Sequence, residues 1–250
     1  LQFIIFSVLT SFIHRFSSPK SFVEVTTLFF PYVMFLGFSC LALGWIWGLA
    51  FAPEDAIQGN SYRIIFLHVP ASIMAQLIYF FMSICALMHL VWRVKLAAYL
   101  IKSAAPVGVM ITFIALFSGS IWGIPTWGTW WQWDARITST LILFIMYLGI
   151  ITLHSSFSNA EKADRLMSIL VVVGVVNIPI IKKSVDWWST LHQPASISIS
   201  DGASIDPSMF YPLTISIFGM ALTMIALGIL VSKLYILNRE KNKKWVQAHV

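Results

Sequence analysis

The sequence predicts an all-α integral membrane protein with six transmembrane helices. Of its 250 residues, 58% are hydrophobic and only 10% are charged, whereas soluble domains carry about 25% charged residues. The apolar residues gather in long segments, and no polar block is large enough to form a separate soluble domain. We therefore expect one membrane domain.

Six stretches are long and apolar enough to cross a hydrocarbon layer about 30 Å thick. Asn177 and Pro179, near the end of the short fifth stretch, predict a break or kink there, because proline removes a backbone donor. Residues 1–28 are expected to form a cytoplasmic N-terminal segment, 29–235 the membrane domain and 236–250 a basic cytoplasmic tail. The predicted spans are residues 29–50, 64–91, 98–121, 137–154, 164–181 and 210–235.

The lysines and arginines predict how these spans are oriented. Twelve of the sixteen lie near the termini, in the second and fourth connections or just inside the third span. By the positive-inside rule both termini are then cytoplasmic, and the connection formed by residues 122–136 lies outside. The basic tail is most simply a topology anchor that contacts membrane lipid, and no nucleic-acid partner is expected.

Five of the eleven tryptophans fall within one twelve-residue window of this outer connection. Gly123, Pro125 and Gly128 are expected to prevent a plain helix in the window, which is too aromatic for a solvated loop. Nine tryptophans lie on the outer side in total, more than an ordinary interfacial belt explains. We therefore expect a flat apolar platform that suits a flat apolar ligand. The nine are Trp45, Trp47, Trp122, Trp127, Trp130, Trp131, Trp133, Trp187 and Trp188.

The predicted topology separates the six histidines. His14 and His249 lie in the tails. His89 and His154 fall near the inner ends of two spans, where snorkelling or contact with the last helical carbonyls explains them. The two that remain on the outer side are the candidate ligands.

These two, His68 and His192, share the outer side with the tryptophans. A pair of imidazoles above and below a planar ligand suits haem, whose iron accepts axial histidines and whose porphyrin needs apolar contact. The haem propionates need cations, and Arg63 and Arg136 are the candidates because a guanidinium can clamp a carboxylate through two parallel hydrogen bonds. Snorkelling at the interface is the alternative for both arginines.

Three further features bear on the chemistry. Asp134 directly precedes the fourth span, where it can cap the first helical N–H groups, or orient an indole or an arginine of the loop, or both. Cys40 and Cys85 lie inside apolar runs and are expected to act as small hydrophobic residues. The sequence contains neither a Cys-x-x-Cys-His motif for attached haem nor a Gly-x-x-x-x-Gly-Lys phosphate loop.

Three segments together resemble a known family. Residues 122–139 match the tryptophan-rich "WWD" signature of haem-handling membrane proteins, and residues 59–70 and 184–193 match the segments that carry the two outer histidines. From about Tyr32 to its C-terminus the chain is similar to the haem exporter protein C family, the C component of the system I cytochrome c maturation apparatus. The related haem lyases share the signature but have many more spans.

The resemblance implies a haem-export component of the bacterial inner membrane and not an enzyme. It implies that haem b is held at the periplasmic face by the tryptophan loop, with His68 and His192 as axial ligands. It also implies delivery to a periplasmic haem chaperone, the E component. A small single-span D component and the ATP-binding cassette components A and B are the other implied partners, and they would supply the ATP hydrolysis for which this chain has no phosphate loop.

Two other functions would fit parts of the pattern. A membrane b-type cytochrome of a quinol oxidoreductase would also use paired histidines, usually on facing helices, and here it would need a second haem between His89 and His154. The permease subunit of an ATP-driven exporter would carry its solute through the spans. The spans hold few of the ionisable groups that normally mark such a pathway.

Overall fold

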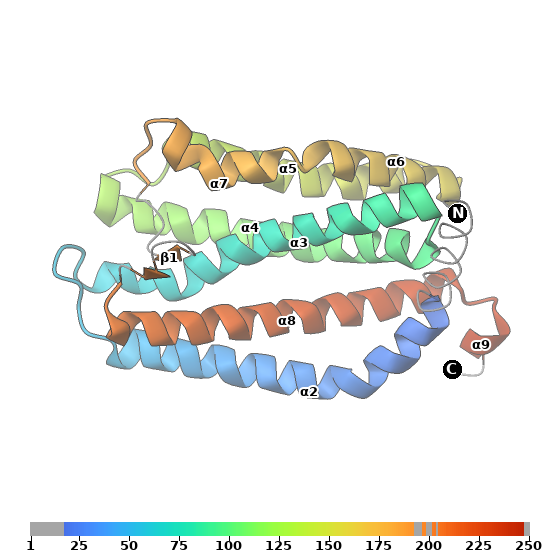
Figure 1. Ribbon diagram of the computed structural model, residues 1–250, viewed down its shortest axis with the longest axis horizontal. Helices are drawn as coiled ribbons and strands as arrows, with labels where there is room; N and C mark the ends of the chain where they lie inside the picture. The colour runs from blue at the N-terminus through green and yellow to red at the C-terminus, as the bar shows by residue number, and fades with distance from the viewer. Residues whose placement is uncertain (1–17, 193–196, 199–201, 204, 248–250) are drawn as a thin grey trace, which may run out of the picture.

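The computed structural model describes residues 18–192, 197–198, 202–203 and 205–247, and nearly all of these residues are helical. The helices run back and forth along one long axis (Figure 1). The predicted all-α membrane fold is confirmed, because six helical segments are long and apolar enough to cross a membrane. These segments are Pro19–Phe51, Asn60–Trp92, Lys95–Trp127, Ala135–Ser155, Ala160–Trp187 and Pro207–Arg239.

Several of these segments combine two helices, and a two-stranded antiparallel ribbon lies in the connection before the last span. In chain order the elements are α2 (Pro19–Ile46), the π-helix η1 (Trp47–Phe51), the 3-10 helix η2 (Asn60–Ile64), α3 (Ile65–Trp92), α4 (Lys95–Trp127), α5 (Ala135–Ser155), α6 (Ala160–Gly174), α7 (Asn177–Trp187), β1 (Ile197–Ser198), β2 (Gly202–Ala203), α8 (Pro207–Arg239) and α9 (Lys244–Gln247).

The third span is longer than predicted. Helix α4 continues through Gly123 and Pro125 to Trp127, so the predicted helix break at these two residues is wrong. Leaving the helix within apolar surroundings would expose several unpaired backbone groups, whereas one proline removes only a single donor. The helix ends at Gly128, whose φ of 72° lies in the left-handed region that glycine adopts most easily. The first two tryptophans of the window are therefore helical.

The predicted break in the fifth span is confirmed. Helix α6 ends at Gly174 and α7 begins at Asn177. The backbone nitrogen of Pro179 cannot donate to the carbonyl of Val175, and the proline ring clashes with that carbonyl in a regular helix. The helix is therefore interrupted one turn before Pro179. The side-chain amide of Asn177 donates to the backbone carbonyl of Ser139 at 2.9 Å, and this bond attaches the start of α7 to α5.

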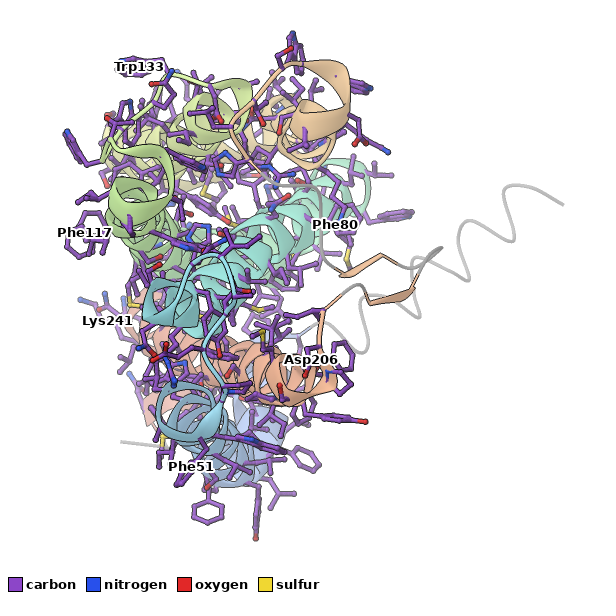
Figure 2. All side chains as sticks on the ribbon, turned by 90° about the vertical axis from the view of Figure 1, so that its left-hand side faces the viewer. Phe51, Phe80, Phe117, Trp133, Asp206 and Lys241 are labelled. Atoms are coloured by element: carbon purple, nitrogen blue, oxygen red, sulfur yellow. The ribbon has the colours of Figure 1, made fainter. Side chains whose placement is uncertain are left out.

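The helices form three layers, seen from the end in Figure 2. Helices α2 and α8 form one outer layer, α3 and α4 the middle one, and α5 with α6 and α7 the other outer layer. Helices α2 and α8 can approach closely at Gly219 because glycine has no side chain. A Cβ at this position would lie only 2.3 Å from the backbone nitrogen of Leu41. Large apolar side chains such as Phe80 and Phe117 point outward from the middle layer, as contact with hydrocarbon requires.

The two ends of the bundle differ in composition. We call the end that holds the η1–η2, α4–α5 and α7–α8 connections the tryptophan end. The opposite end, which holds the α3–α4 and α5–α6 connections and α9, is the basic end, because most of the lysines and arginines in the described ranges lie there. His14 and His249 lie outside the described residues, as do parts of the predicted terminal segments 1–28 and 236–250.

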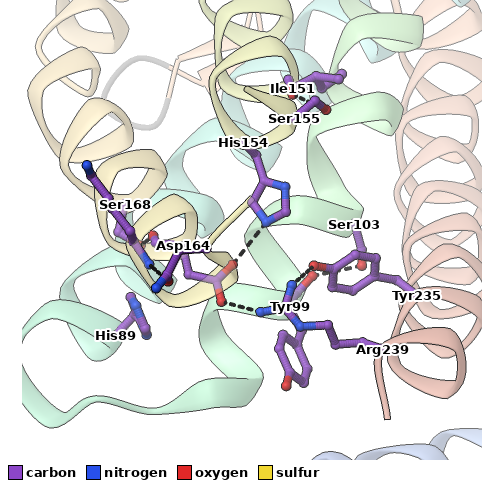
Figure 3. A network of polar contacts seen from close by, with 12 residues as sticks. His89, Tyr99, Ser103, Ile151, His154, Ser155, Asp164, Ser168, Tyr235 and Arg239 are labelled. Atoms are coloured by element: carbon purple, nitrogen blue, oxygen red, sulfur yellow. Dashed lines mark hydrogen bonds and ion pairs between the residues drawn. The ribbon is translucent and has the colours of Figure 1, made fainter. Parts of the chain in front are cut away.

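A buried carboxylate joins three spans at the basic end (Figure 3). Asp164 of α6 is only 6% exposed, and its two oxygens lie 3.0 Å from Nε2 of His154 and 3.0 Å from Nη2 of Arg239. Nη1 of Arg239 also donates to the hydroxyl of Tyr235 at 3.1 Å. His154 therefore pairs with a carboxylate and not with a helix carbonyl, while Nδ1 of His89 lies 3.3 Å from the backbone carbonyl of Val94.

Removing this carboxylate should destabilise the bundle. Asp164→Asn keeps the size of the side chain but leaves Arg239 without its counter-charge and His154 without its carboxylate partner, and breaking such a buried ion pair costs about 3 kcal/mol. We expect the thermal midpoint of the purified protein in detergent to fall by several degrees. The matched control is Lys183→Met, which breaks an ion pair to Asp186 whose side chains are both more than half exposed and which should cost less than about 1 kcal/mol. Equal thermal midpoints for the two variants would contradict the conclusion that Asp164 stabilises the contact between the spans.

Candidate functional site

His68 lies in the first turns of α3, at the tryptophan end, against α4. Its Nδ1 atom is 3.0 Å from the carbonyl oxygen of Ala115 and 3.1 Å from the hydroxyl of Ser118. That hydroxyl already donates to the carbonyl of Ile114 at 2.6 Å, so both neighbours of Nδ1 act as acceptors. The proton of the neutral ring is therefore on Nδ1, and Nε2 keeps its lone pair. The polar group near Nε2 is the hydroxyl of Ser72, at 3.5 Å.

The start of α3 is held by a tryptophan of α2. Pro70 cannot donate to the carbonyl of Phe66 four residues earlier, which would leave that oxygen unpaired in apolar surroundings. The indole N–H of Trp45 donates to it instead, at 3.0 Å. This hydrogen bond attaches α2 to α3 two residues from His68.

His192 follows α7 and is held by the residue that caps α5. Its Nδ1 atom lies 2.9 Å from Oδ2 of Asp134, whose side chain is 6% exposed. The other oxygen of Asp134 accepts the backbone N–H of Ile137 at 2.7 Å, so the predicted cap is present. A carboxylate can only accept, so Nδ1 of His192 carries the proton, and Nε2 has no hydrogen-bond partner among the described residues. The side chain that Asp134 orients is therefore a histidine, and not the indole or arginine that the sequence suggested.

The surroundings of Asp134 favour its charged form. Burial by itself raises the pKa of this carboxyl group, but the hydrogen bonds from His192 and from the backbone N–H of Ile137 outweigh it. The pKa of Asp134 is therefore held below its ordinary value, and the group is a carboxylate at neutral pH. An anionic partner of this kind fixes the tautomer and the orientation of a histidine ring and strengthens it as a metal ligand.

Each of the two histidines also contacts one tryptophan of α4. The rings of His68 and Trp122 meet edge to face, with centroids 5.7 Å apart and planes inclined by 75°. His192 meets Trp127 in the same way, at 4.7 Å and 61°. Trp122 and Trp127 lie in the last turns of the same helix, so α4 contacts both histidines. We call the residues that contact each imidazole the His68 seat and the His192 seat.

The remaining tryptophans of the window do not form the single flat platform that was predicted. Trp131 is inclined by 48° to Trp130 and by 77° to Trp133. Trp130 and Trp133 are 66% and 73% exposed, and Trp133 stands at the edge of the bundle in Figure 2. The indole nitrogen of Trp131 is buried and has no hydrogen-bond partner within the described part of the chain. The cluster is a set of tilted walls with one unused donor.

The two arginines differ in the donors that they have free. Nε of Arg136 donates to the hydroxyl of Ser184 at 3.3 Å, and its terminal nitrogens have no partner among the described residues. Arg63 donates to the carbonyls of Gly48 (3.2 Å), Leu49 and Ala52 (2.8 Å), which end η1, and to the side chain of Asn60 at 2.7 Å. A guanidinium has five N–H groups, so Arg136 keeps a two-nitrogen fork whereas Arg63 keeps one N–H.

Two apolar hollows flank the outer half of α4. One, of about 380 Å³, is lined by residues of α2, α3 and α4 and includes Leu67 and Ser118, which adjoin the His68 seat, with Arg63 among its polar groups. The other, of about 330 Å³, lies between α4 and α5 below Trp130 and Trp131. Both are suited to flat or chain-like apolar groups and not to hydrated ions.

Comparison with known proteins identifies the family. The profile described as Heme exporter protein C matches residues 12–247. The protein of that name from Escherichia coli K12 is 46% identical over 234 residues, which cover 94% of each chain. The one from Haemophilus influenzae is 42% identical over 236 residues, or 94% of this chain and 96% of its own. The chain belongs to the haem exporter protein C family.

The resemblance expected from the WWD and histidine segments is thereby confirmed. The chain is also similar to a protein from Marchantia polymorpha that is described as a putative cytochrome c biosynthesis ccmC-like mitochondrial protein. It is 47% identical over 162 residues, which are 65% of this chain and 68% of its own.

Sequence reasoning missed three residues that shape the histidine seats of this haem exporter C family member. Ser118 and Gly119 precede Trp122 by four and three positions and therefore share its helix face. That signal was available, but the predicted third span ended before Trp122. Gln58, whose side chain accepts the indole N–H of Trp122 at 2.8 Å, lies 64 positions away and carries no local signal.

The His68 seat should be sensitive to one methyl group. A Cβ on Gly119 would lie 2.7 Å from Cε1 of His68, so Gly119→Ala must displace the imidazole, and overpacking of this kind costs about 1–3 kcal/mol. Gly149→Ala in α5 is the matched control, because nothing lies within 4 Å of its added methyl. We expect a lower thermal midpoint in detergent for the first variant only. A Gly119→Ala protein as stable as the Gly149→Ala protein would argue against this packing.

Proposed function

We propose that this chain holds haem b at its tryptophan end, between His68 and His192, and passes it on to another protein. Membership of the haem exporter protein C family supports a haem-handling role in cytochrome c maturation. The relatives' names describe transport components, so we assign transfer of haem and no catalysis of its own to this chain. Haem is the cargo in this proposal, and the chain supplies its binding groups.

One observation carries the proposal. His68 and His192 come from segments far apart in the sequence, and each ring uses Nδ1 in a hydrogen bond to the protein. In the resulting tautomers Nε2 keeps its lone pair, and a neutral imidazole binds a metal through the ring nitrogen that has the lone pair. Histidines that ligate a metal almost always donate their other ring N–H in this way. Neither ring needs to change its Nδ1 hydrogen bond before it binds iron, and at His68 only the long contact between Nε2 and the Ser72 hydroxyl, at 3.5 Å, would be displaced.

The groups around the two histidines fit the rest of haem. The tilted indoles are apolar contact surface for the macrocycle, and the hollow that includes Leu67 and Ser118 adjoins the His68 ring. We assign the bidentate clamp on a propionate to Arg136, because its terminal nitrogens have no partner in the described part of the chain, and at most a single hydrogen bond to Arg63. The unpartnered indole N–H of Trp131 is a further donor for an anionic group.

The distribution of charge supports the orientation. Because most lysines and arginines lie at the basic end, that end is cytoplasmic by the positive-inside rule, and the haem site faces the periplasm across a bacterial inner membrane. An open site at this surface lets a second protein reach one edge of the haem. The exposed rings of Trp130, Trp133, Trp187 and Trp188 lie at the same end of the bundle and suit such an encounter.

We propose the same partners that the resemblance implied: a periplasmic haem chaperone (the E component), a single-span D component and the ATP-binding cassette components A and B. The lack of a phosphate-binding loop in this sequence supports the assignment of ATP hydrolysis to another chain. A contact at the basic end weakens the b-type cytochrome alternative, because Nε2 of His154 pairs with Asp164 and is not open to a second haem iron.

Loss of either outer histidine should abolish haem retention. We expect His68→Ala and His192→Ala to lose the haem absorption band of the purified protein and to stop cytochrome c maturation, because one axial bond is removed in each. His89→Ala, at the basic end, is the control and should keep the spectrum. A double variant that retained full haem and supported maturation would rule out the ligand assignment.

Asp134 should affect the iron through His192. Asp134→Asn keeps an acceptor for the α5 cap but removes the charge that makes His192 a stronger ligand. We expect haem affinity to fall about 10- to 100-fold, the range found when such outer partners are changed, and the reduction potential of bound haem to rise. Potentiometric titration and haem dissociation rates measure both. An unchanged potential would mean that Asp134 serves the helix cap alone.

A further inference from the structure

The connection between η1 and η2 folds into a tight hairpin. Oδ1 of Asp55 accepts the backbone N–H groups of Ile57 at 2.9 Å and of Gln58 at 2.7 Å. Asp55 and Gly59 also exchange two backbone hydrogen bonds, of 3.3 and 2.9 Å. Gly59 has a φ of 55°, in the region that favours glycine. The backbone of Gln58 is therefore fixed within the turn.

The hairpin is also attached to the helices on either side. The hydroxyl of Ser61 donates to the carbonyl of Gln58 at 2.6 Å, and the hydroxyl of Tyr62 donates to the carbonyl of Pro53 at 2.6 Å. Arg63, one residue further on, binds the carbonyls at the end of η1. These bonds give Gln58 a defined position relative to α2 and α3.

From this position the side chain of Gln58 reaches α4. Its Oε1 atom accepts the indole N–H of Trp122 at 2.8 Å. An indole nitrogen can only donate, and this is its one hydrogen bond within the described part of the chain. Gln58 therefore selects one rotation of the Trp122 ring among those that packing alone would permit.

The Trp122 ring forms one wall of the His68 seat. Backbone atoms of α4 fix two other sides, through the Ala115 carbonyl that accepts from Nδ1 and through the close approach of Gly119 to Cε1. Ser118 and Ser72 contribute small hydroxyls, whereas Trp122, whose ring centroid lies 5.7 Å from that of the imidazole, is a large wall whose position depends on side-chain torsions. A change in its rotation is therefore a change in the space available to His68.

We propose that Gln58 is a positioning residue that, through Trp122, sets the orientation of the His68 imidazole and so the strength of its bond to haem iron. The statement about iron rests on the proposed function. The statement about Trp122 does not, because that contact is present without haem. Neither the WWD signature nor the histidine pair contains Gln58, which lies outside both.

Three variants separate this role from general damage to the hairpin. Gln58→Leu keeps a similar size and removes the acceptor, whereas Gln58→Glu keeps an acceptor and should rescue the contact. Ile57→Ala is the matched control, since the neighbouring side chain is 94% exposed. In haem-free protein labelled with 5-fluorotryptophan, the Trp122 fluorine resonance, assigned with Trp122→Phe, should shift or broaden for Gln58→Leu alone.

The haem-loaded proteins supply the second measurement. Gln58→Leu should lose haem to excess apomyoglobin about two- to tenfold faster, as expected for one hydrogen bond, with changed g values in the electron paramagnetic resonance spectrum. Gln58→Glu and Ile57→Ala should match the unmodified protein. The proposal is overturned if the Trp122 resonance of Gln58→Leu is unchanged, or if Gln58→Glu behaves like Gln58→Leu. Failure of the proposed function would instead show as haem retention by His68→Ala, whatever Trp122 does.

Discussion

Polar groups inside an apolar helical bundle must find partners within the protein, and most of the site described above follows from that constraint. At His68 the partners are the Ala115 carbonyl and the Ser118 hydroxyl, both acceptors, so the ring must present its proton on Nδ1. At His192 the same result comes from the carboxylate of Asp134. Two unrelated surroundings therefore select the same tautomer and leave the same nitrogen available.

The constraint also explains which residues are structural and which are available to a ligand. The carbonyl released by Pro70 is paired by Trp45, and the carbonyls at the end of η1 are paired by Arg63. The side-chain donors of both residues are thus largely consumed by the fold. Arg136 and Trp131 lie in the same region but keep donors without partners in the described structure. Unsatisfied donors in a mostly buried place are costly unless something binds them.

The two ends of the bundle differ in the same respect. At the basic end the two oxygens of Asp164 pair with Arg239 and His154, which suits a structural joint between spans. At the tryptophan end the Nε2 atom of His192 and the guanidinium fork of Arg136 have no partner among the described residues, and we propose that haem, which has a metal, carboxylates and a large flat surface, supplies it. This asymmetry supports binding of cargo at one face, and it does not call for a chain of ionisable groups across the membrane.

From the sequence alone one can determine the class of fold, the number of spans and the segments that carry His68, His192 and the tryptophans, because hydrophobic length and motif spacing are read locally along the chain. The interruption before Asn177 belongs with these, since a proline acts on its own turn. The extension of α4 to Trp127, the tilt of the indoles and the pairs 58–122, 68–115 and 134–192 were decided only by the tertiary structure. Each of these pairs joins two elements whose separation depends on how the layers pack. No property of Gln58 or Asp134 within its own segment specifies which side chain that packing will bring to it.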